Sequence, residues 1–185
     1  MTRPFTTNKA VAVKRNGEWV SWTYEEYFAA SRAAARGLLA AGLQRQKGVG
    51  IMGYNSPEMF FSFLGSVFAG GLGCGIYPTS SGDSVSYLSN HTPFDILLVE
   101  DNAMLDTILD GRNVDEAFPT LKKIVLMAPG STSNESKKAI TWTEMIAGGE
   151  SVPESRLDEI EEEQFVNEAC MMLFTSGTTG RRKFN

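Results

Sequence analysis

The stretch "VGIMGYNSPEMFFSFLGSVFAGGLGCGIY", residues 49–77, decides the fold class of this chain. It opens with a short apolar run, breaks at residues 53–55, and then places Ser56 and Pro57 where a helix would begin. These residue types favour the N-cap and the first turn of a helix. The predicted helix ends at two adjacent glycines, and a second apolar run follows. The stretch therefore predicts a strand, a loop, a helix and another strand.

The same alternation continues along the chain. Short apolar runs that alternate with helical segments imply crossover connections, and therefore a mostly parallel sheet with helices on both faces. The sequence thus predicts an α/β fold. The further helices predicted lie at residues 82–90, 102–109 and 142–147, and the further strands at residues 95–99, 123–127 and 170–174.

Two polar segments interrupt this pattern. Residues 128–138 predict a flexible polar loop. Residues 154–163 contain six acidic side chains, which we interpret as a solvated linker or an exposed helix face, because like charges gather where water can screen them.

The N-terminal part contains a turn signal and a helix-start signal. Two strand-like runs flank Asn16 and Gly17, a dipeptide typical of tight β-hairpins. A helix is predicted over residues 23–42, since Thr23 and Glu26 have the spacing of a capping box.

The overall composition excludes several classes of function. The chain has 185 residues, 42% of them hydrophobic, and a formal charge of -5, so we expect no nucleic-acid partner. Two cysteines, Cys74 and Cys170, cannot form a disulfide framework, and we predict that both are buried. With one histidine there is no metal-ligand cluster of familiar spacing. No long apolar segment indicates a signal peptide or a membrane span, so we expect a cytoplasmic location.

Two glycine-rich stretches precede the C-terminal region. Gly48, Gly50 and Gly53 match the G-x-G-x-x-G pattern of dinucleotide-binding folds, but they lie within a predicted strand instead of opening a helix. The glycines at residues 70–75 lead from a helix into a strand. We expect close backbone packing there, and no dinucleotide site at the first stretch.

The stretch "TSGTTGRRK" follows the last predicted strand, at the edge of the sheet where such folds bind ligands. Glycines let successive backbone N–H groups converge on an anion, hydroxyls add donors, and Arg181, Arg182 and Lys183 supply positive charge. It is not a Walker A loop, because arginine precedes the lysine. The alternative interpretation is a polar turn with a basic tail. The candidate phosphate-binding residues are Thr175, Ser176, Gly177, Thr178, Thr179, Gly180 and Lys183.

This stretch resembles the phosphate loop of the adenylate-forming enzymes, T-S-G-T-T-G-x-P-K-G. That family comprises acyl-CoA synthetases, luciferases and the adenylation domains of peptide synthetases. "SWTYEEY" at residues 21–27 is similar to an early element of the family, and residues 53–81 resemble long-chain acyl-CoA synthetases of the bubblegum type. The matches span nearly the whole chain in the family's order.

The resemblance implies a function and its ligands. The implied reaction joins a fatty acid to ATP, giving an acyl-adenylate and pyrophosphate, and then transfers the acyl group to coenzyme A. The implied cofactors are ATP, Mg²⁺ and coenzyme A, with the loop residues around the phosphates and Lys183 as a point charge. A fatty substrate would also allow peripheral contact with a membrane.

The resemblance also gives an expectation about domains. Residues 1–185 would be a partial N-terminal AMP-binding domain that ends just after the phosphate loop, with the C-terminal domain absent. Arg182 and Phe184 depart from the family's proline and glycine. We expect the loop to be anchored on one side only, and the chain alone to be inactive. The alternatives are a noncatalytic remnant and a regulatory module that pairs with an intact relative.

Overall fold

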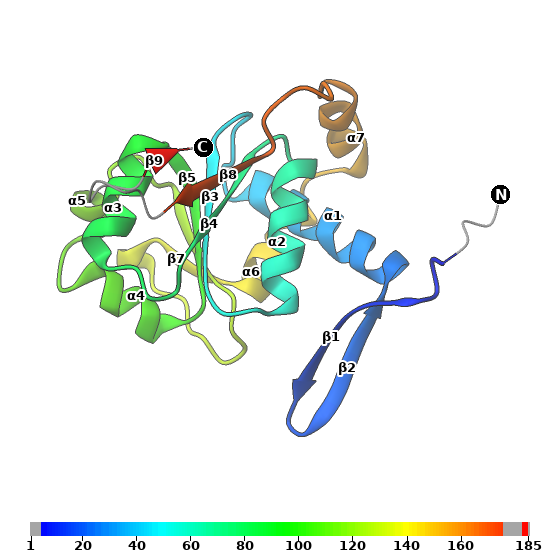
Figure 1. The fold of residues 1–185 in the computed structure, drawn as a ribbon, viewed down its shortest axis with the longest axis horizontal. Coiled ribbons are helices and arrows are strands. Elements are labelled where there is room, and N and C mark those ends of the chain that lie inside the picture. The colour runs from blue at the N-terminus through cyan, green and yellow to red at the C-terminus, as the bar shows by residue number, and fades with distance from the viewer. Residues whose placement is uncertain (1–4, 176–182, 185) are drawn as a thin grey trace.

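The computed structural model describes residues 5–175 and 183–184, and its centre is a seven-stranded sheet (Figure 1). The strand order is β7-β6-β5-β3-β4-β8-β9. Neighbouring strands from β7 to β8 are parallel, whereas β9 runs antiparallel to β8. The strands are β3 (Gly48–Met52), β4 (Leu72–Ile76), β5 (Phe94–Val99), β6 (Lys123–Leu126), β7 (Ala139–Thr141), β8 (Met171–Thr175) and β9 (Lys183–Phe184).

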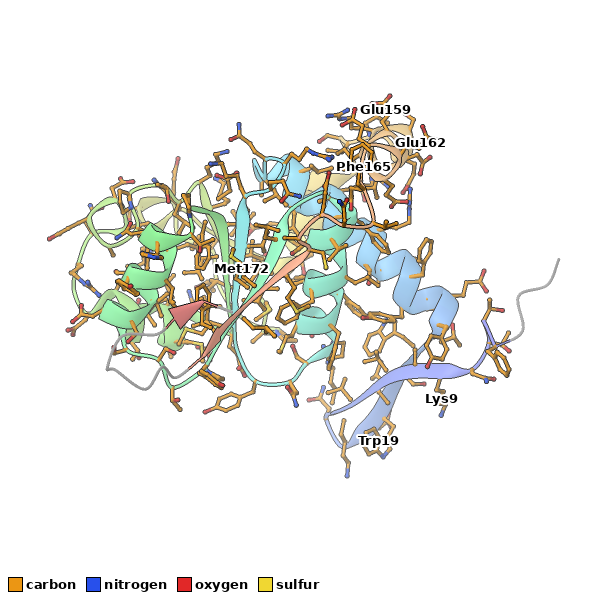
Figure 2. All side chains as sticks on the ribbon, turned by 45° about the horizontal axis from the view of Figure 1, so that its top comes forward. Lys9, Trp19, Glu159, Glu162, Phe165 and Met172 are labelled. Carbon is orange, nitrogen blue, oxygen red and sulfur yellow. The ribbon has the colours of Figure 1, made fainter. Side chains whose placement is uncertain are left out.

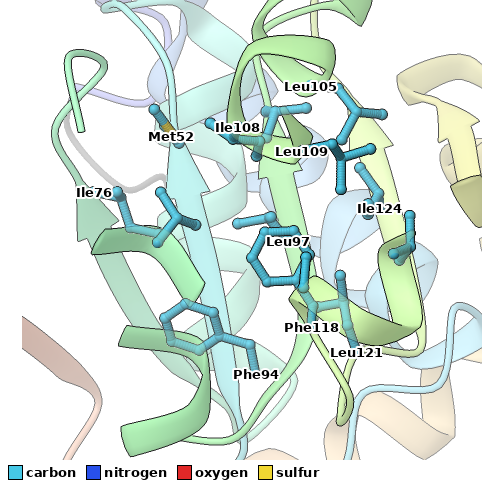
Figure 3. Close-up of a cluster of buried hydrophobic side chains, with 14 of the residues drawn as sticks. Met52, Ile76, Phe94, Leu97, Leu105, Ile108, Leu109, Phe118, Leu121 and Ile124 are labelled. Carbon is cyan, nitrogen blue, oxygen red and sulfur yellow. The ribbon is translucent and has the colours of Figure 1, made fainter. Parts of the chain in front are cut away.

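Helices cover both faces of the sheet, as the α/β prediction required. In β5, Ile96 and Leu98 face one hydrophobic cluster, while Leu97 and Val99 face the other, part of which Figure 3 shows. The first cluster packs beneath α1 (Tyr24–Ala40), α2 (Pro57–Phe68), α6 (Trp142–Gly149) and α7 (Glu154–Glu162); the second packs beneath α3 (Gly82–His91), α4 (Asn102–Leu109) and α5 (Val114–Ala117). The predicted fold class is therefore confirmed.

The predicted helix starts are confirmed by their hydrogen bonds. The backbone N–H of Glu26 donates to Thr23 Oγ1 at 3.2 Å, and the N–H of Thr23 donates to the Glu26 carboxylate at 2.8 Å. Ser56 Oγ accepts from the N–H of Met59 at 3.2 Å, with Pro57 as the first helical residue of α2. Each cap satisfies a backbone N–H that the helix itself cannot pair.

An N-terminal hairpin projects from the body of the molecule (Figure 1). Its strands are β1 (Lys9–Arg15) and β2 (Glu18–Thr23). Asn16 and Gly17 both have positive φ, 52° and 87°, as a tight hairpin turn requires. Arg15 pairs with Glu58 at 2.5 Å, so an ion pair ties the hairpin to the start of α2.

Two of the three glycines of the G-x-G-x-x-G pattern lie inside a strand, and Gly53 follows its end. Gly48 and Gly50 belong to β3, and a Cβ atom would lie 2.4 Å from the ring of Phe94 at the first and 2.8 Å at the second. A glycine is therefore needed at both positions for the aromatic ring to cross β3.

Four short elements in the described part of the chain escaped the sequence analysis, namely α5, η1 (Glu135–Lys137), β7 and β9. The polar segment 128–138 contains the 3₁₀ turn η1 and leads directly into β7. The helix α5 has only four residues. Elements this short show no measurable period of apolar residues, so no pattern could indicate them.

The acidic segment forms the helix α7, so the helix-face interpretation is confirmed and the linker interpretation is wrong. Figure 2 labels Glu159 and Glu162 on this helix, while its apolar residues Leu157 and Ile160 are buried. Several of its carboxylates are not merely solvated, because they pair with Arg32 on α1.

The prediction that both cysteines are buried is wrong for one of them. Cys74 is buried in β4, but Cys170 is exposed. Cys170 lies just before β8, outside the buried run of the sheet, and the neighbouring Met171 is also 45% exposed. In the described part of the chain, no helix combines the length and the apolar character needed to cross a membrane.

Candidate active site at the carboxyl edge of the sheet

The predicted phosphate loop leaves the sheet from β8 and returns to it as β9. Thr175 is the last residue of β8 and Lys183 is the first residue of β9. The backbone pairs Thr175 with Lys183 and Phe174 with Phe184. The predicted site residues Ser176, Gly177, Thr178, Thr179 and Gly180 lie outside the described residues.

This pairing corrects the expectation that the loop is anchored on one side only. The expectation arose because few residues follow Lys183, but Lys183 and Phe184 form a strand beside β8. Residues paired across antiparallel strands have Cα atoms about 4.5–5.5 Å apart. Two of the predicted site residues, Thr175 and Lys183, are therefore neighbours.

The order of the strands reverses at β3, and β4 separates β3 from β8. β3 leads into α2 on one face of the sheet, and its neighbour β5 leads into α4 on the opposite face. In α/β sheets, ligands bind in the crevice that such a reversal opens at the carboxyl ends of the strands. Since β3, β4 and β8 are parallel neighbours, the connections that follow them lie at the same edge.

A carboxylate at the reversal point fixes the connection after β3. Glu100 directly follows β5, and its Oε2 accepts a hydrogen bond from the backbone N–H of Tyr54 at 2.7 Å. The carbonyl oxygen of Glu100 accepts from the N–H of Ala128, also at 2.7 Å. The sequence analysis missed Glu100, although an acidic residue immediately after the buried run 94–99 is a signal that could have found it.

A pocket of about 420 Å³ opens beside these connections. Residues of β3 and the connection after it, of β4 and the connection after it, and of β8 line the pocket. Among the described residues that line it, none carries a charge. The lining includes the side chains of Ile51, Tyr54, Met59, Ile76, Leu173 and Phe174.

A larger hollow, of about 830 Å³, lies between the N-terminal segment and the helices α1 and α2. Its walls include Phe5, Tyr24 and Phe28. Figure 1 shows that the N-terminal segment lies at the hairpin end of the molecule, away from the central sheet that contains β8. The smaller pocket, which shares β8 with the predicted phosphate loop, is therefore the one relevant to the site.

The described residues offer neither a reactive thiol in the sheet nor a metal cluster. Burial raises the pKa of the Cys74 thiol to about 12, so this group stays protonated and is a poor nucleophile. Within the described part of the chain, no three His, Cys, Asp or Glu side chains gather closely enough to hold a metal ion.

Comparison with known proteins places this arrangement in a family. The family model "AMP-binding enzyme" matches residues 3–184. The chain is 36% identical to the long-chain-fatty-acid–CoA ligase ACSBG2 of Xenopus laevis over 174 residues, which is 94% of this chain and 23% of the relative. It is 37% identical to the human ligase ACSBG1, with 94% and 24% coverage. The chain thus spans about a quarter of the length of these relatives, and the family resemblance found in the sequence is confirmed.

Solved structures show the same fold. The anthranilate CoA ligase AuaEII, in complex with anthranoyl-AMP, superposes with a TM-score of 0.72 at 20% identity, covering 98% of this chain and 32% of that enzyme. The acyl-CoA synthetase of Brucella canis gives a TM-score of 0.69 at 15% identity, with 96% and 30% coverage. At such identities the likeness concerns the fold alone.

Proposed function

The chain belongs to the AMP-binding enzyme family, and on that premise we propose that it forms the phosphate-binding part of a fatty acid–CoA ligase. In the proposed reaction, a carboxylate oxygen of the fatty acid attacks the α-phosphorus of ATP, and pyrophosphate leaves with the bridging oxygen. The sulfur of coenzyme A then loses its proton and attacks the acyl carbon, and AMP leaves. The observation that carries the proposal is the family match over residues 3–184.

The loop between β8 and β9 has the stabilising role in this proposal. Negative charge grows on the β- and γ-phosphates as pyrophosphate leaves, and donors placed in advance around those oxygens stabilise the transition state. We assign the donors to Lys183 as a point charge and to the backbone and hydroxyl groups of the other loop residues. Those residues are Thr175, Ser176, Gly177, Thr178, Thr179 and Gly180.

The pairing of β8 with β9 supports this assignment. A loop that binds phosphate works because its donors are ordered before the ligand arrives, so both of its ends must be held. The ladder between Thr175 and Lys183 closes the base of the loop at the carboxyl edge of the sheet. This is the edge at which α/β folds bind their ligands.

Magnesium and coenzyme A are part of the proposed reaction, but the described residues assign no site to either. Residues 1–185 would form part of an N-terminal AMP-binding domain. Peripheral contact with a membrane also belongs to this proposal, because the fatty substrate partitions into membranes.

Binding of pyrophosphate to the 185-residue chain tests the proposal directly. We expect Lys183→Ala to weaken binding by roughly 10- to 100-fold, the usual effect of losing a charge-assisted hydrogen bond. Lys14→Ala on the exposed face of β1 removes the same charge far from the loop and should change little. Isothermal titration calorimetry at fixed ionic strength measures both. Equal affinities of the two variants, or no saturable binding by the unmodified chain, would contradict the proposal.

A second candidate function is a noncatalytic module that pairs with another polypeptide. The observation that favours it is the outward side of β8, where Met171 and Leu173 are 45% and 60% exposed. Sedimentation of the chain with and without an intact long-chain ligase would detect such a complex. The double variant Met171→Asp, Leu173→Asp should lose this complex. If it sediments with the ligase to the same extent as the unmodified chain, this second function is dismissed.

A further inference from the structure

We propose that the 830 Å³ hollow between the N-terminal segment and the helices α1 and α2 binds an alkylated ammonium cation, of the kind that choline carries. The hollow lies at the hairpin end of the molecule, away from the central sheet (Figure 1). The inference therefore goes beyond the proposed ligase function and does not depend on it.

The wall of the hollow is rich in aromatic rings. Four of the described lining residues are aromatic, namely Phe5, Tyr24, Tyr27 and Phe28. The face of an aromatic ring carries partial negative charge and attracts a cation that lies within about 6 Å of its centre. Several rings around one space are how proteins recognise quaternary ammonium groups. An uncharged apolar ligand would also fit such rings, so the charge of the wall decides between the two.

The single charge among the described lining residues is negative. Glu25 carries it, and its carboxylate has neither an ion pair nor a hydrogen bond within the described part of the chain. Glu25 and Glu26 also occupy the first turn of α1, where they offset the partial positive charge of the helix N-terminus. The wall therefore attracts a cation and repels an anion. A quaternary ammonium suits it best, because this group has no N–H to satisfy and its methyl groups pack on the rings.

One ring of the wall already contacts a cation from outside the hollow. The guanidinium of Arg32 lies 5.8 Å from the centre of the Phe28 ring, and Arg32 is not among the described lining residues. Three carboxylates of α7 balance its charge, at 2.9, 2.6 and 2.7 Å, so it adds no net repulsion. The Phe28 ring also meets the Phe68 ring edge-on, with 5.5 Å between their centres. These contacts hold the Phe28 ring in place before a ligand binds.

Backbone hydrogen bonds hold the N-terminal wall against α1. The N–H of Glu25 donates to the carbonyl oxygen of Thr6 at 3.2 Å, and the N–H of Tyr24 donates to that of Asn8 at 3.0 Å. The N–H of Asn8 donates to the carbonyl oxygen of Phe5 at 3.1 Å, across a turn in which Phe5 has a φ of 85°. A wall fixed before binding lowers the entropic cost of taking up a ligand.

The volume indicates a ligand larger than the ammonium group alone. A hollow of about 830 Å³ lies within the usual range for small-molecule sites, and half-buried Leu64 of α2 adds an apolar surface to its wall. A fully buried methylene tightens binding roughly four-fold. Because the hollow is open to water, we expect butyltrimethylammonium to bind about ten-fold more tightly than tetramethylammonium, which is less than full burial of three methylenes would give.

A neutral isostere separates a cation site from an apolar one. In 3,3-dimethylbutan-1-ol a carbon atom replaces the nitrogen of choline, so the shape is kept and the charge is lost. Isothermal titration calorimetry with the 185-residue chain compares the two. We expect choline to bind saturably with a dissociation constant on the order of 1 mM, and the alcohol to bind at least about five-fold more weakly.

Two aromatic residues give a matched pair of variants. The Phe28 and Phe60 rings are 46% and 44% exposed, but only Phe28 belongs to the described wall. Phe28→Ala should weaken choline binding at least about five-fold, whereas Phe60→Ala should leave it within about two-fold. Glu25→Gln should weaken binding, and Glu18→Gln on β2 removes the same charge outside the described wall. Urea denaturation of each variant establishes that the chains compared are folded.

Two sources offer this ligand chemistry, soluble quaternary amines and the choline headgroups of membrane lipids. Sedimentation with phosphatidylcholine vesicles distinguishes them, with phosphatidylglycerol vesicles as the control. Sedimentation with phosphatidylcholine alone that Phe28→Ala abolishes assigns the site to the headgroup. Binding of free choline without sedimentation assigns it to a soluble amine.

Three results overturn the proposal. They are equal affinities for choline and its neutral isostere, equal choline affinities of the Phe28→Ala and Phe60→Ala chains, and no saturable binding of choline or butyltrimethylammonium below about 10 mM. The first and third results come from the unmodified chain and so do not depend on the folding of a variant. Neither phosphate nor fatty acid is present in these titrations, so their failure is distinct from failure of the pyrophosphate titration.

Discussion

Replacing Arg32 by glutamine should weaken the attachment of α7 to α1, which Arg36 also supports through Glu154 at 2.7 Å. The Arg32 guanidinium donates to Glu154 at 2.9 Å, to Asp158 at 2.6 Å and to Glu161 at 2.7 Å. Its own side chain is only 15% exposed, whereas the three carboxylates are 54%, 60% and 34% exposed. One guanidinium group thus pairs with three carboxylates that would otherwise repel one another.

The expected loss of stability follows from these exposures. Ion pairs that remain in contact with water contribute about 0.2–1 kcal/mol each, so three pairs give roughly 1–2 kcal/mol. The guanidinium also lies 5.8 Å from the centre of the Phe28 ring, which adds about 0.5 kcal/mol. We therefore expect Arg32→Gln to lower the free energy of unfolding by about 2 kcal/mol, or the midpoint of thermal unfolding by about 4–8 °C.

Arg156→Gln is the matched control. Arg156 lies on α7 and pairs with Glu159 within the same helix, with 53% and 60% of the two side chains exposed, so its loss should cost about 0.3 kcal/mol. Urea denaturation followed by tryptophan fluorescence measures both variants. The difference between the stability losses of the two variants should become smaller in 1 M salt, where the screening length is about 3 Å. Equal losses for Arg32→Gln and Arg156→Gln at low salt would refute the reasoning.

Three further outcomes are expected. Gly50→Ala should destabilise the chain by about 1–3 kcal/mol, because the added Cβ atom would overpack against an aromatic ring of β5. Gly148→Ala should not, because the nearest atom to its added Cβ would lie 3.9 Å away, and urea denaturation compares the two variants. A thiol reagent at mildly alkaline pH should modify Cys170 quickly and Cys74 only on unfolding, since the second thiol is buried with a pKa of about 12; one fast and one slow phase are expected. The hydrogen bond from Arg32 holds the pKa of Glu154 below its ordinary value. The ionised Glu154 carboxylate therefore stabilises the fold above its unfolded-state pKa, and this stabilisation is lost as the pH falls through the lower folded-state pKa. The difference in unfolding free energy between the unmodified chain and Glu154→Gln should vanish over that acidic range.

The elements that could be predicted are those whose boundaries are set locally. Thr23 with Glu26, Ser56 with Pro57, and the Asn16–Gly17 turn each act through hydrogen bonds or dihedral angles within a few residues. A strand such as β7 depends on a neighbour instead. Its three residues pair with β6, and nothing in their own sequence distinguishes them from a loop.

The parts of the site that escaped prediction depend on contacts between distant segments. Tyr54 and Glu100 are 46 positions apart, and Arg32 and Glu154 are 122 apart. The charge pattern indicated that the acidic side chains are solvated, but it could not identify the arginines with which they form ion pairs. Those pairs exist only because α7 packs against α1 in the folded chain.

The strand β8 explains why the sequence located the edge of the site but not the pocket. A run of five apolar or small residues predicts a strand buried on both faces. In the structure only one face is covered: Phe174 is buried, while Leu173, on the other face, is 60% exposed. Leu173 is also part of the wall of the 420 Å³ pocket. Because alternate residues of a strand point to opposite sides of the sheet, an apolar run does not reveal which of its two faces the neighbouring elements cover.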